Sequence, residues 1–498
     1  MKLIGGETLR EKTFFVTTPI YYPNGKPHIG SVYTTLLADF FARFNRLLGK
    51  ETFFLTGTDE HGLKLYRAAQ KAGKQPKEYV DEMSQYFKDA WSKLNIEYDR
   101  FIRTTDPDHE ETVKYIVERI YENGYIYPGK YSGWYCVSCE TYYDEEELIK
   151  EGDKYLCPIH RKPVEFMEEE THFFKLSTFK NEILKLINNG LVQPEKYAKG
   201  LLARLQNLQD ISMTRTKDRV PWGIEFPVDK RFTVYVWFDA LVNYISGIGY
   251  PHDMRKFNKF WPAVHIIGKD ILWFHAVVWP AMLLAAGIKH PKKILVHGFW
   301  TVEGVKMGKS LGNVVYYDDL LKYHPDVVRY YLLKSGPVDK DGNFSWNELK
   351  EVYKNELSNE IGNLVRRVTL FAKKNYPTID GELDENLMNE LKNHIDKAKT
   401  SIEKFVPSQY TVAALSIFKT INRYFTEKEP WKTNDKNAVY NSLAGIEIGA
   451  LVLYPVMPEI SRKILESIGV DLTPLLEYQK KTFTIKDSPI LFPKLGEY

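Results

Sequence analysis

Residues 13–31 read TFFVTTPIYYPNGKPHIGS. The opening TFFVTTPIYY is β-branched and aromatic, which predicts a strand. A turn-like PNGKP follows, and from Ile29 to Leu48 apolar residues recur every three or four positions, as in an amphipathic helix. ETFFLTGTDEHG (51–62) predicts a second strand that enters a polar loop, and helical patterns continue to about Gly124. This alternation predicts an α/β fold, a parallel sheet with crossover helices.

Two further segments differ in character. Residues 125–230 are rich in Tyr, Gly and Pro and contain every cysteine of the chain, so we expect an insertion of short strands and a knuckle. Strand signals return in TVYVWFDAL (233–241) and recur up to KILVHGF (293–299), which indicates that the sheet resumes after the insertion. From about residue 350 they cease, and Lys/Glu/Asn-rich stretches with helical spacing predict a helical bundle.

The composition is that of a globular protein, with 44% hydrophobic and 27% charged residues over 498 positions. That length accommodates roughly three domains of about 150 residues. The net charge of +3 is small, so a polyanion would be bound by local basic patches. The longest apolar run, AVVWPAMLLAAGI (276–288), has 13 residues and an internal Pro, whereas spanning a bilayer takes about 20. The N-terminus carries charges where a signal peptide is apolar, so we expect a cytoplasmic protein without a membrane segment.

The stretch VEGVKMGKSLGN (302–313) contains Gly-Lys-Ser, the end of a phosphate-binding P-loop. A P-loop requires a further glycine five positions before the Gly of Gly-Lys-Ser, where this chain has Glu303; Gly304 comes one residue too late. The P-loop interpretation is therefore excluded. What remains is a Gly-flanked loop with Lys306 and Lys309, which either closes over a polyphosphate or is an ordinary exposed loop.

Two polar loops follow the predicted strands. In PHIGS (27–31), His28 lies where the loop meets a helix, and a helix N-terminus offers free N–H groups to an anion. Gly30 leaves room for a flat base or a phosphate, although a terminal His without a role is the alternative. GTDEHG (57–62) lies at the carboxyl end of a strand, where open α/β sheets bind ligands. Asp59 either binds a cationic amine there or caps the next helix.

The cysteines Cys136, Cys139 and Cys157 fall in one window with His160. The spacing Cys-x2-Cys-x17-Cys-x2-His is typical of a structural zinc site, because four N/S ligands leave no open position on the metal. An odd, sparse set of cysteines argues against a disulfide framework. Chance clustering of free thiols is the alternative.

The helical region contains LSNEIGNLVRR (357–367) and EKEPWK. Asn359, Asn363 and Arg367 are spaced by four and share one helical face. Asn and Arg side chains can bind base edges, and Trp431 could stack on an unpaired base. The alternative is a solvated helix face with a core tryptophan.

PHIGS lies where class I aminoacyl-tRNA synthetases carry their HIGH motif, and KMGKS (306–310) lies where they carry KMSKS. Longer stretches resemble the methionyl-tRNA synthetase family over essentially the whole chain: TTPIYYPNGKPHIG, FLTGTDEHG, YVWFDALVNYI, HIIGKDILWFHAVVWPAML and HGFWTVEGVKMGKSLGN. The resemblance implies a Rossmann-type parallel sheet split by a zinc-bearing insertion and followed by an all-α anticodon-binding bundle. The resemblance implies that residues 1–124 and 231–300 form the two halves of the Rossmann domain. Residues 125–230 would form the connective insertion, with its zinc knuckle at about 131–165. Residues 301–350 would form the KMSKS-type loop and linking region, and residues 351–498 the helical anticodon-binding domain.

The resemblance also implies an activity in two steps, ATP-dependent formation of methionyl-adenylate and transfer of methionine to the 3′ end of its tRNA. Mg²⁺ would accompany the ATP. Such a reaction needs no protein nucleophile, so its catalysis consists of positioning and charge neutralisation. The implied catalytic residues are His28, Lys306 and Lys309, and the implied ATP-binding residues are His28, Gly30, Ser31, Lys306, Gly308, Lys309 and Ser310. The implied methionine pocket consists of Ile20, Tyr22, Asp59, Trp237, Ala240, Tyr244, Ile271 and His275. The implied anticodon-binding residues are Asn363, Arg367 and Trp431, and the implied zinc ligands are Cys136, Cys139, Cys157 and His160.

The chain departs from the family motifs at two positions. Ser31 replaces the second His of HIGH and cannot carry a charge, whereas Gly308 replaces the middle Ser of KMSKS and leaves both lysines in place. Residue 498 ends the chain without the extra tRNA-binding domain of some relatives, which predicts a monomer or a complex with a separate tRNA-binding subunit. The alternatives are a zinc-containing tRNA-binding relative that has lost catalysis, supported by Ser31 alone, and another class I synthetase, for leucine or cysteine.

Overall fold

The computed structural model describes residues 11–139, 141–308, 311–336, 338–474, 478 and 480–493. Lys309 and Ser310, two of the expected ATP-site residues, lie outside these ranges. In the described part of the chain, no helix is long and apolar enough to cross a membrane.

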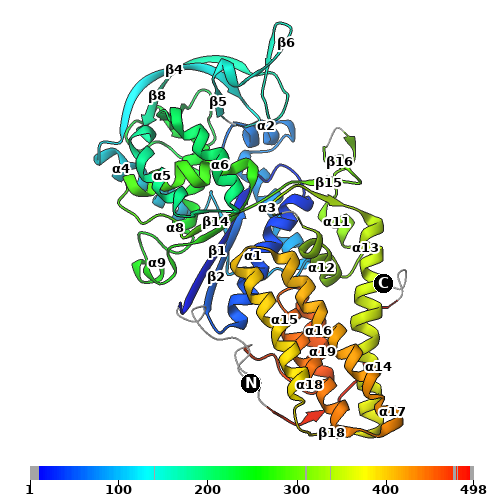
Figure 1. Ribbon diagram of the computed structural model, residues 1–498. Coiled ribbons are helices and arrows are strands. Elements are labelled where there is room, and N and C mark those ends of the chain that lie inside the picture. The colour runs from blue at the N-terminus through cyan, green and yellow to red at the C-terminus, as the bar shows by residue number, and fades with distance from the viewer. Residues whose placement is uncertain are drawn as a thin grey trace.

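A parallel sheet forms the centre of the N-terminal half (Figure 1). Its described strands run in the order β3-β2-β1-β13-β14-β9, and every neighbouring pair is parallel. The strands are β1 (Thr13–Tyr21), β2 (Glu51–Thr58), β3 (Arg100–Arg103), β9 (Val192–Gln193), β13 (Val264–Gly268) and β14 (Lys293–His297). The predicted fold class, a parallel α/β sheet with an insertion and a helical bundle, is confirmed.

Helices connect the strands of this sheet. The crossover helices are α1 (Ile29–Leu47), α2 (Leu63–Lys71), α3 (Pro76–Lys93), α4 (Pro107–Glu122), α8 (Asn243–Ser246), α9 (Met254–Phe260) and α10 (Trp279–Ala285). A π-helical turn, Phe274–Val278, precedes α10. Helix α1 stops just before Gly49, whose φ of +75° lies in the left-handed region that ends helices and favours glycine.

The insertion is built on one long antiparallel pair. Strands β4 (Ile126–Cys136) and β8 (Glu165–Phe174) pair along their length, with β5 (Thr141–Tyr143) and β10 (Ile211–Ser212) at the two edges. The hairpin of β6 (Ile149–Glu151) and β7 (Lys154–Leu156) lies beyond β5. The expectation of short strands is therefore wrong for β4 and β8, because the two strands protect each other's backbone over ten residue pairs.

The insertion also contains helices and a strand of the main sheet. Helices α5 (Lys180–Asn188) and α6 (Glu195–Arg204) follow β8. Strand β9 lies between them and pairs with β14 through Val192 and Gln193, so it extends the parallel sheet at its edge. The segment between residues 125 and 230 is thus attached to the sheet in its middle as well as at its ends.

The strand expected at 233–241 is present only at its start. Strand β12 (Phe232–Val234) pairs with β11 (Thr214–Thr216) alone, outside the main sheet, and α7 (Val236–Leu241) follows. All but one of the residues of α7 are buried, including Asp239. A short helix that is buried on every side has no polar face, so its sequence cannot be distinguished from that of a buried strand.

The C-terminal half begins with a linking region, in which β15 (Trp300–Val302) pairs with β16 (Val305–Lys306) and β17 (Gly342–Phe344). Helices α11 (Tyr317–Leu320) and α12 (Pro325–Ser335) lie between β16 and β17. The bundle then comprises α13 (Trp346–Val352), a π-helical segment (Tyr353–Gly362), α14 (Asn363–Asn375), α15 (Glu385–Glu403), α16 (Pro407–Lys428), α17 (Pro430–Thr433), α18 (Lys436–Leu453) and α19 (Pro458–Ser467). A small ribbon of β18 (Thr378–Ile379) and β19 (Phe483–Thr484) closes its far end. In Figure 1 the insertion and the bundle lie at opposite ends of the molecule.

Helix α1 belongs to both halves of the protein. One side covers the sheet, and the other packs on the bundle, where the rings of Phe40 and Tyr410 meet edge to face at 5.0 Å. A single hydrophobic core runs from Val16 in β1 through α1 to Phe492 near the C-terminus. The sheet and the bundle are therefore joined by a shared core.

A buried ion-pair network lies within this shared core. The Asp39 carboxylate of α1 accepts hydrogen bonds from Arg43 Nε at 2.7 Å and from Arg329 Nη2 of α12 at 2.6 Å, and all three side chains are 0% exposed. Arg329 also donates to the carbonyl of Val456, between α18 and α19. Burial opposes ionisation of Asp39, but the charges of Arg43 and Arg329 outweigh it and hold the pKa of Asp39 below its usual value.

Candidate active site and metal centre

His28 is the N-cap of α1. Its Nδ1 accepts a hydrogen bond from the Gly30 N–H at 3.0 Å, while Ser31 Oγ accepts from the His28 N–H at 3.1 Å and donates to the His28 carbonyl at 2.9 Å. Ser31 thus uses its hydroxyl in a capping box. A Cβ on Gly30 would lie 2.8 Å from His28 Cε1, so only glycine allows this ring position.

The first backbone N–H groups of α1 already donate to acceptors within the protein. The Ile29 N–H donates to the Val315 carbonyl at 2.8 Å, and the Gly30 N–H is bonded to His28. The expectation that this helix terminus offers free N–H groups is therefore wrong for Ile29 and Gly30. An anion at this end would be held by side chains and by the helix dipole.

The segment after KMGKS lies directly against PHIGS. In addition to the bond between Ile29 and Val315, the Tyr317 N–H donates to the Pro27 carbonyl at 3.0 Å, and His28 forms an antiparallel bridge with Tyr316. PHIGS and residues 315–317, which lie almost 290 positions later in the sequence, are thereby held side by side beyond the carboxyl end of β1. This is the end of an open α/β sheet at which ligands bind.

The KMGKS loop is held at its base by Asn313. The Asn313 side chain accepts from the Gly308 N–H at 2.9 Å and donates to the Lys306 carbonyl at 3.1 Å. Lys306 itself ends the exposed strand β16, and its ammonium is open to solvent. Gly304 supplies a positive φ of 78° in the turn between β15 and β16.

Tyr244 and His275 form a buried, hydrogen-bonded pair. Both side chains are 1% exposed, and Tyr244 Oη and His275 Nε2 are 2.6 Å apart. His275 Nδ1 lies 2.9 Å from the Ile271 carbonyl, so Nδ1 carries the proton and Tyr244 donates to Nε2. Burial lowers the pKa of His275 to about 4, which keeps the ring neutral at physiological pH. This buried pair is therefore uncharged.

Further aromatic rings lie near His275. Trp237 stacks on Phe274 at 3.9 Å with an interplanar angle of 2°, and its ring centroid is 6.4 Å from that of His275. Ile20, Tyr22 and Ile271 pack against the same apolar cluster, and Ala240 is buried beside it on α7. Several residues of the predicted methionine pocket thus belong to one apolar cluster, which also includes Phe274, and their binding of methionine stays a prediction.

Asp59 places a carboxylate near Tyr244. It follows β2, is 5% exposed, and donates its backbone N–H to the Tyr21 carbonyl at 2.9 Å. Its carboxylate lies near enough to Tyr244 to add to the rise in the pKa of that hydroxyl, which burial mainly causes. Helix α2 begins at Leu63 with Gly62 as its N-cap, so the alternative that Asp59 caps the helix is wrong.

A second polar layer braces the loop that carries Asp59. His61 Nδ1 donates to Asp239 Oδ2 at 2.7 Å, and His109 Nε2 donates to Asp239 Oδ1 at 2.8 Å. Burial opposes a charge on His61, but the carboxylate of Asp239 outweighs it and raises the pKa of His61. Glu60 is held by Arg103 through two bonds of 2.7 and 2.8 Å. Sequence reasoning missed this layer, because His109 and Arg103 come from other elements.

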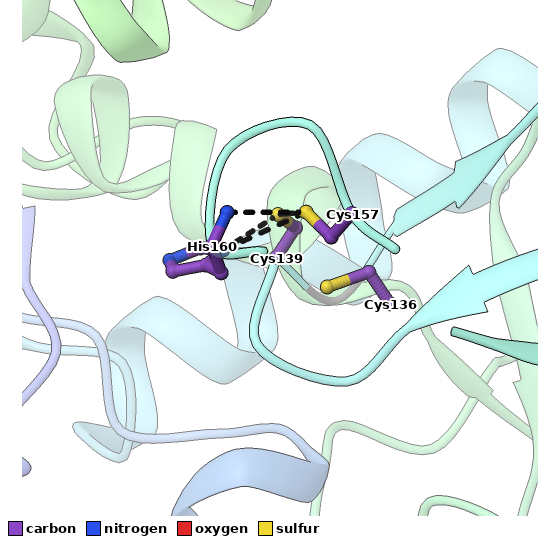
Figure 2. A group of neighbouring side chains, drawn as sticks. All are labelled: Cys136, Cys139, Cys157 and His160. Carbon is purple, nitrogen blue, oxygen red and sulfur yellow. Dashed lines mark hydrogen bonds between the residues drawn. The ribbon is translucent and has the colours of Figure 1, made fainter. Parts of the chain in front are cut away.

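The four predicted metal ligands converge at the end of β4 (Figure 2). The Sγ atoms of Cys136, Cys139 and Cys157 and a ring nitrogen of His160 all lie within 4.8 Å of one another. Tetrahedral zinc with Zn–S bonds of about 2.3 Å places its ligand atoms roughly 3.8 Å apart, so the cluster fits that ion. The hydrogen bond between Cys136 and Cys139 lowers the pKa of the Cys136 thiol and raises that of the Cys139 thiol, so the pair shares one negative charge. The donor set closes the coordination shell and suits a structural site.

Comparison with known proteins agrees with this geometry. The family model for class I tRNA synthetases (M) matches residues 14–162 and 150–369. The chain is 41% identical over 494 residues to methionine–tRNA ligase of Thermotoga maritima, covering 95% of this chain and 78% of that protein. It is 36% identical over 536 residues to methionine–tRNA ligase of Streptomyces coelicolor, covering 100% and 99%.

A solved structure is similar along almost the whole chain. Mycobacterium tuberculosis methionyl-tRNA synthetase in complex with methionyl-adenylate superimposes with a TM-score of 0.93 and 34% identity, covering 97% of this chain and 100% of that one. The chain belongs to the methionyl-tRNA synthetases. The alternative of a class I synthetase for leucine or cysteine is thereby excluded.

In this member of the methionyl-tRNA synthetases, the candidate anticodon residues lie on the helical bundle. Asn363 and Arg367 are exposed on α14, and Trp431 on α17 is 42% exposed. The Arg367 guanidinium lies 5.2 Å from the Phe425 ring centroid, and the Trp431 ring is 5.6 Å from the same ring. The alternative of a core tryptophan is wrong. Asn359 lies in the π-helical segment, where the wider winding changes the four-residue spacing assumed for it.

Proposed function

We propose that this chain attaches methionine to its cognate tRNA in two steps, ATP-dependent formation of methionyl-adenylate and transfer of methionine to the 3′ end of the tRNA. The observation that carries the proposal is the contact between the segment after KMGKS and PHIGS, made through the backbone bonds of Ile29 with Val315 and of Tyr317 with Pro27. The uncharged Tyr244–His275 pair, the stacked rings of Trp237 and Phe274 and the carboxylate of Asp59 near Tyr244 support a site for an amino acid with an apolar side chain.

ATP would bind over His28 and Gly30, with the lysines of KMGKS closing on its phosphates. Lys306 supports this role because its ammonium is open to solvent at the end of a hairpin whose base Asn313 holds. Lys309, Ser310, Gly308 and Ser31 are assigned to the same site from the family motifs. Mg²⁺ would accompany the nucleotide and reduce the charge of its phosphates. The protein supplies positioning and positive charge, and no covalent bond forms between the protein and the substrate.

Methionine would lie with its α-amino group near Asp59 and its thioether against Trp237, Tyr244 and His275. Sulfur makes favourable contacts with aromatic edges, and the neutral His275 presents no charge to repel or desolvate. Ile20, Tyr22, Ala240 and Ile271 would complete the apolar wall.

Cys136, Cys139, Cys157 and His160 would hold one structural Zn²⁺. When bound, the ion crosslinks the end of β4 to the segment after β7, and it takes no part in the reaction. Asn363, Arg367 and Trp431 would bind unpaired anticodon bases of the tRNA. We infer a cytoplasmic location for the enzyme.

Amino-acid-dependent ATP–pyrophosphate exchange across the twenty amino acids, followed by charging of tRNA, tests the proposal. We expect exchange with methionine alone. Asp59→Asn should raise the KM for methionine at least tenfold, because a hydrogen bond to a charged group contributes about 1.5–3 kcal/mol. Asp487→Asn, at an exposed acid far from the pocket, is the matched control. Exchange with no amino acid would favour a tRNA-binding relative without catalysis, and a faster exchange with another amino acid would refute the methionine pocket.

A further inference from the structure

The Arg367 guanidinium extends from α14 but is held by α16. Its Nη2 donates to Asn422 Oδ1 at 2.9 Å and to Thr426 Oγ1 at 3.0 Å, and both acceptors lie one turn apart on α16. We propose that Asn422 and Thr426 are positioning residues that fix Arg367 for recognition of an unpaired anticodon base. The inference rests on the anticodon role proposed above for Arg367.

Each acceptor is itself oriented by a further bond. Asn422 Nδ2 lies 3.4 Å from Glu360 Oε2 in the π-helical segment, so the amide oxygen faces Arg367. The Thr426 hydroxyl donates its proton to the Asn422 carbonyl at 2.7 Å, which leaves an oxygen lone pair for the arginine. Neither side chain can turn its donor toward Arg367 without losing a partner. The orientation of the guanidinium is therefore set by α16 and the π-helical segment together.

The aromatic neighbours fix the plane of the same guanidinium. It lies over the buried ring of Phe425, and Trp431 approaches that ring from α17 at 5.6 Å. A base that stacks on the exposed Trp431 would therefore lie close to Arg367. An aromatic ring that stacks a base beside an arginine that binds its edge is the arrangement used for single-stranded RNA.

The hydrogen bonds of Arg367 also decide which of its donors face the RNA. Both Nη2 hydrogens are taken by Asn422 and Thr426. Among the residues that the structure describes, Nε and Nη1 donate to no side chain or carbonyl, so their N–H groups remain available for a base or a phosphate. Positioning by α16 thus selects one edge of the guanidinium for recognition.

A double-mutant cycle tests the proposal. We compare Asn422→Ala, Thr426→Val and Arg367→Ala, alone and combined, in the full chain, at equal concentrations of active enzyme determined by ATP–pyrophosphate exchange. Thr400→Val is the matched control, because Thr400 is exposed on α15 and makes the same hydroxyl-to-carbonyl bond without contacting Arg367. The substrates are the methionine tRNA transcript and the same transcript with an altered anticodon.

We expect Asn422→Ala and Thr426→Val each to raise the KM for the tRNA about fivefold with kcat unchanged, as when one flexible side chain has to be immobilised on binding. The control should change neither parameter. In the Arg367→Ala background, Asn422→Ala should not raise the KM for the tRNA any further. With the altered anticodon, Asn422→Ala should leave the KM unchanged even when Arg367 is present.

Two results would overturn the positioning role. One is a KM that rises equally in the presence and absence of Arg367, which would indicate a general effect on the bundle. The other is a KM that falls in Asn422→Ala, which would mean that α16 competes with the RNA for Arg367. If Arg367→Ala leaves the KM for the tRNA unchanged, the anticodon role of Arg367 fails as well, so the two failures can be distinguished.

Discussion

Asp39 forms hydrogen-bonded ion pairs with two arginines in the core shared by the sheet and the bundle. Replacing it with Ala removes the partner of Arg43 and Arg329 while both remain 0% exposed. Glu97 lies 3.3 Å from Arg43, but its side chain is 44% exposed and cannot serve Arg329. Asp39→Ala therefore removes the carboxylate that is hydrogen-bonded to both buried guanidinium groups.

The magnitude follows from the burial. Removing one partner of a fully buried ion pair destabilises a protein by about 3–5 kcal/mol, because the remaining charge is neither hydrated nor paired. We expect about 4 kcal/mol for Asp39→Ala. Asp396→Ala is the matched control: Asp396 forms the same i,i+4 helix pair with Lys392, but the two side chains are 51% and 41% exposed. Exposed pairs of this kind contribute about 0.3–0.5 kcal/mol.

Hydrogen–deuterium exchange measures the loss of stability in the elements that contact the replaced residue. The chain has several structural parts and a single unfolding transition would not define one free energy, so local opening is the better quantity. At tenfold for each 1.4 kcal/mol, protection of the amides in α1 and around Val456 should fall roughly a thousandfold in Asp39→Ala and hardly at all in Asp396→Ala.

The pH dependence provides an internal check. The folded pKa of Asp39 lies below its usual value of 3.8, so the folded state binds fewer protons and this contribution is complete above that pH. It is lost only as the pH falls further, through the folded pKa. The difference between the wild type and Asp39→Ala should therefore be constant between pH 5 and 8. Equal protection in the two Asp→Ala variants would refute the role given to the buried network.

Three further predictions concern the sites. Gly30→Ala should raise the KM for ATP about tenfold in the exchange assay, because the new Cβ would lie 2.8 Å from the His28 ring and break the cap. Gly200→Ala is the control: its Cβ would meet no atom within 4 Å, so the KM for ATP should not change. Cys157→Ser should lower the zinc content measured by elemental analysis and make the insertion more sensitive to limited proteolysis. Burial lowers the pKa of His275 to about 4, so below its usual pKa of 6.5 the unfolded state binds more protons than the folded state. The free energy of unfolding should therefore fall by up to about 3 kcal/mol as the pH drops from 6.5 to 4. The loss of hydrogen–deuterium exchange protection around His275 on acidification should accordingly be smaller in His275→Gln.

The sequence predicted β1, α1 and β2 well, because their apolar residues follow the period of the element that contains them. It failed at α7 and β9 for different reasons. Helix α7 is buried on nearly all sides and shows no period, and β9 has two residues, which is too short for any period. Strand β9 forms because it pairs with the edge of β14, whose residues lie about 100 positions later in the chain.

The candidate site shows the same division. The clustering of Cys136, Cys139, Cys157 and His160 was predictable, because their spacing along the chain is itself the signal. Phe274, His109 and Asn422 were missed, because each acquires its role from a partner on another element. His109 contacts Asp239, 130 residues away, and Asn422 contacts Arg367, 55 residues away. Contacts of this kind leave no pattern in a single sequence.

The position of α1 has a consequence for synthesis of the chain on the ribosome. The helix is complete once the first 50 residues have been made, yet Phe40 lies against Tyr410, and Arg43 bonds to Tyr454, which lies 411 residues later. At about 5–20 residues per second, the covering surface is not made until some 20–80 seconds after α1. During that interval the apolar flank of α1 has no native partner, so a nascent chain of this protein needs shielding by a chaperone until its last helices emerge.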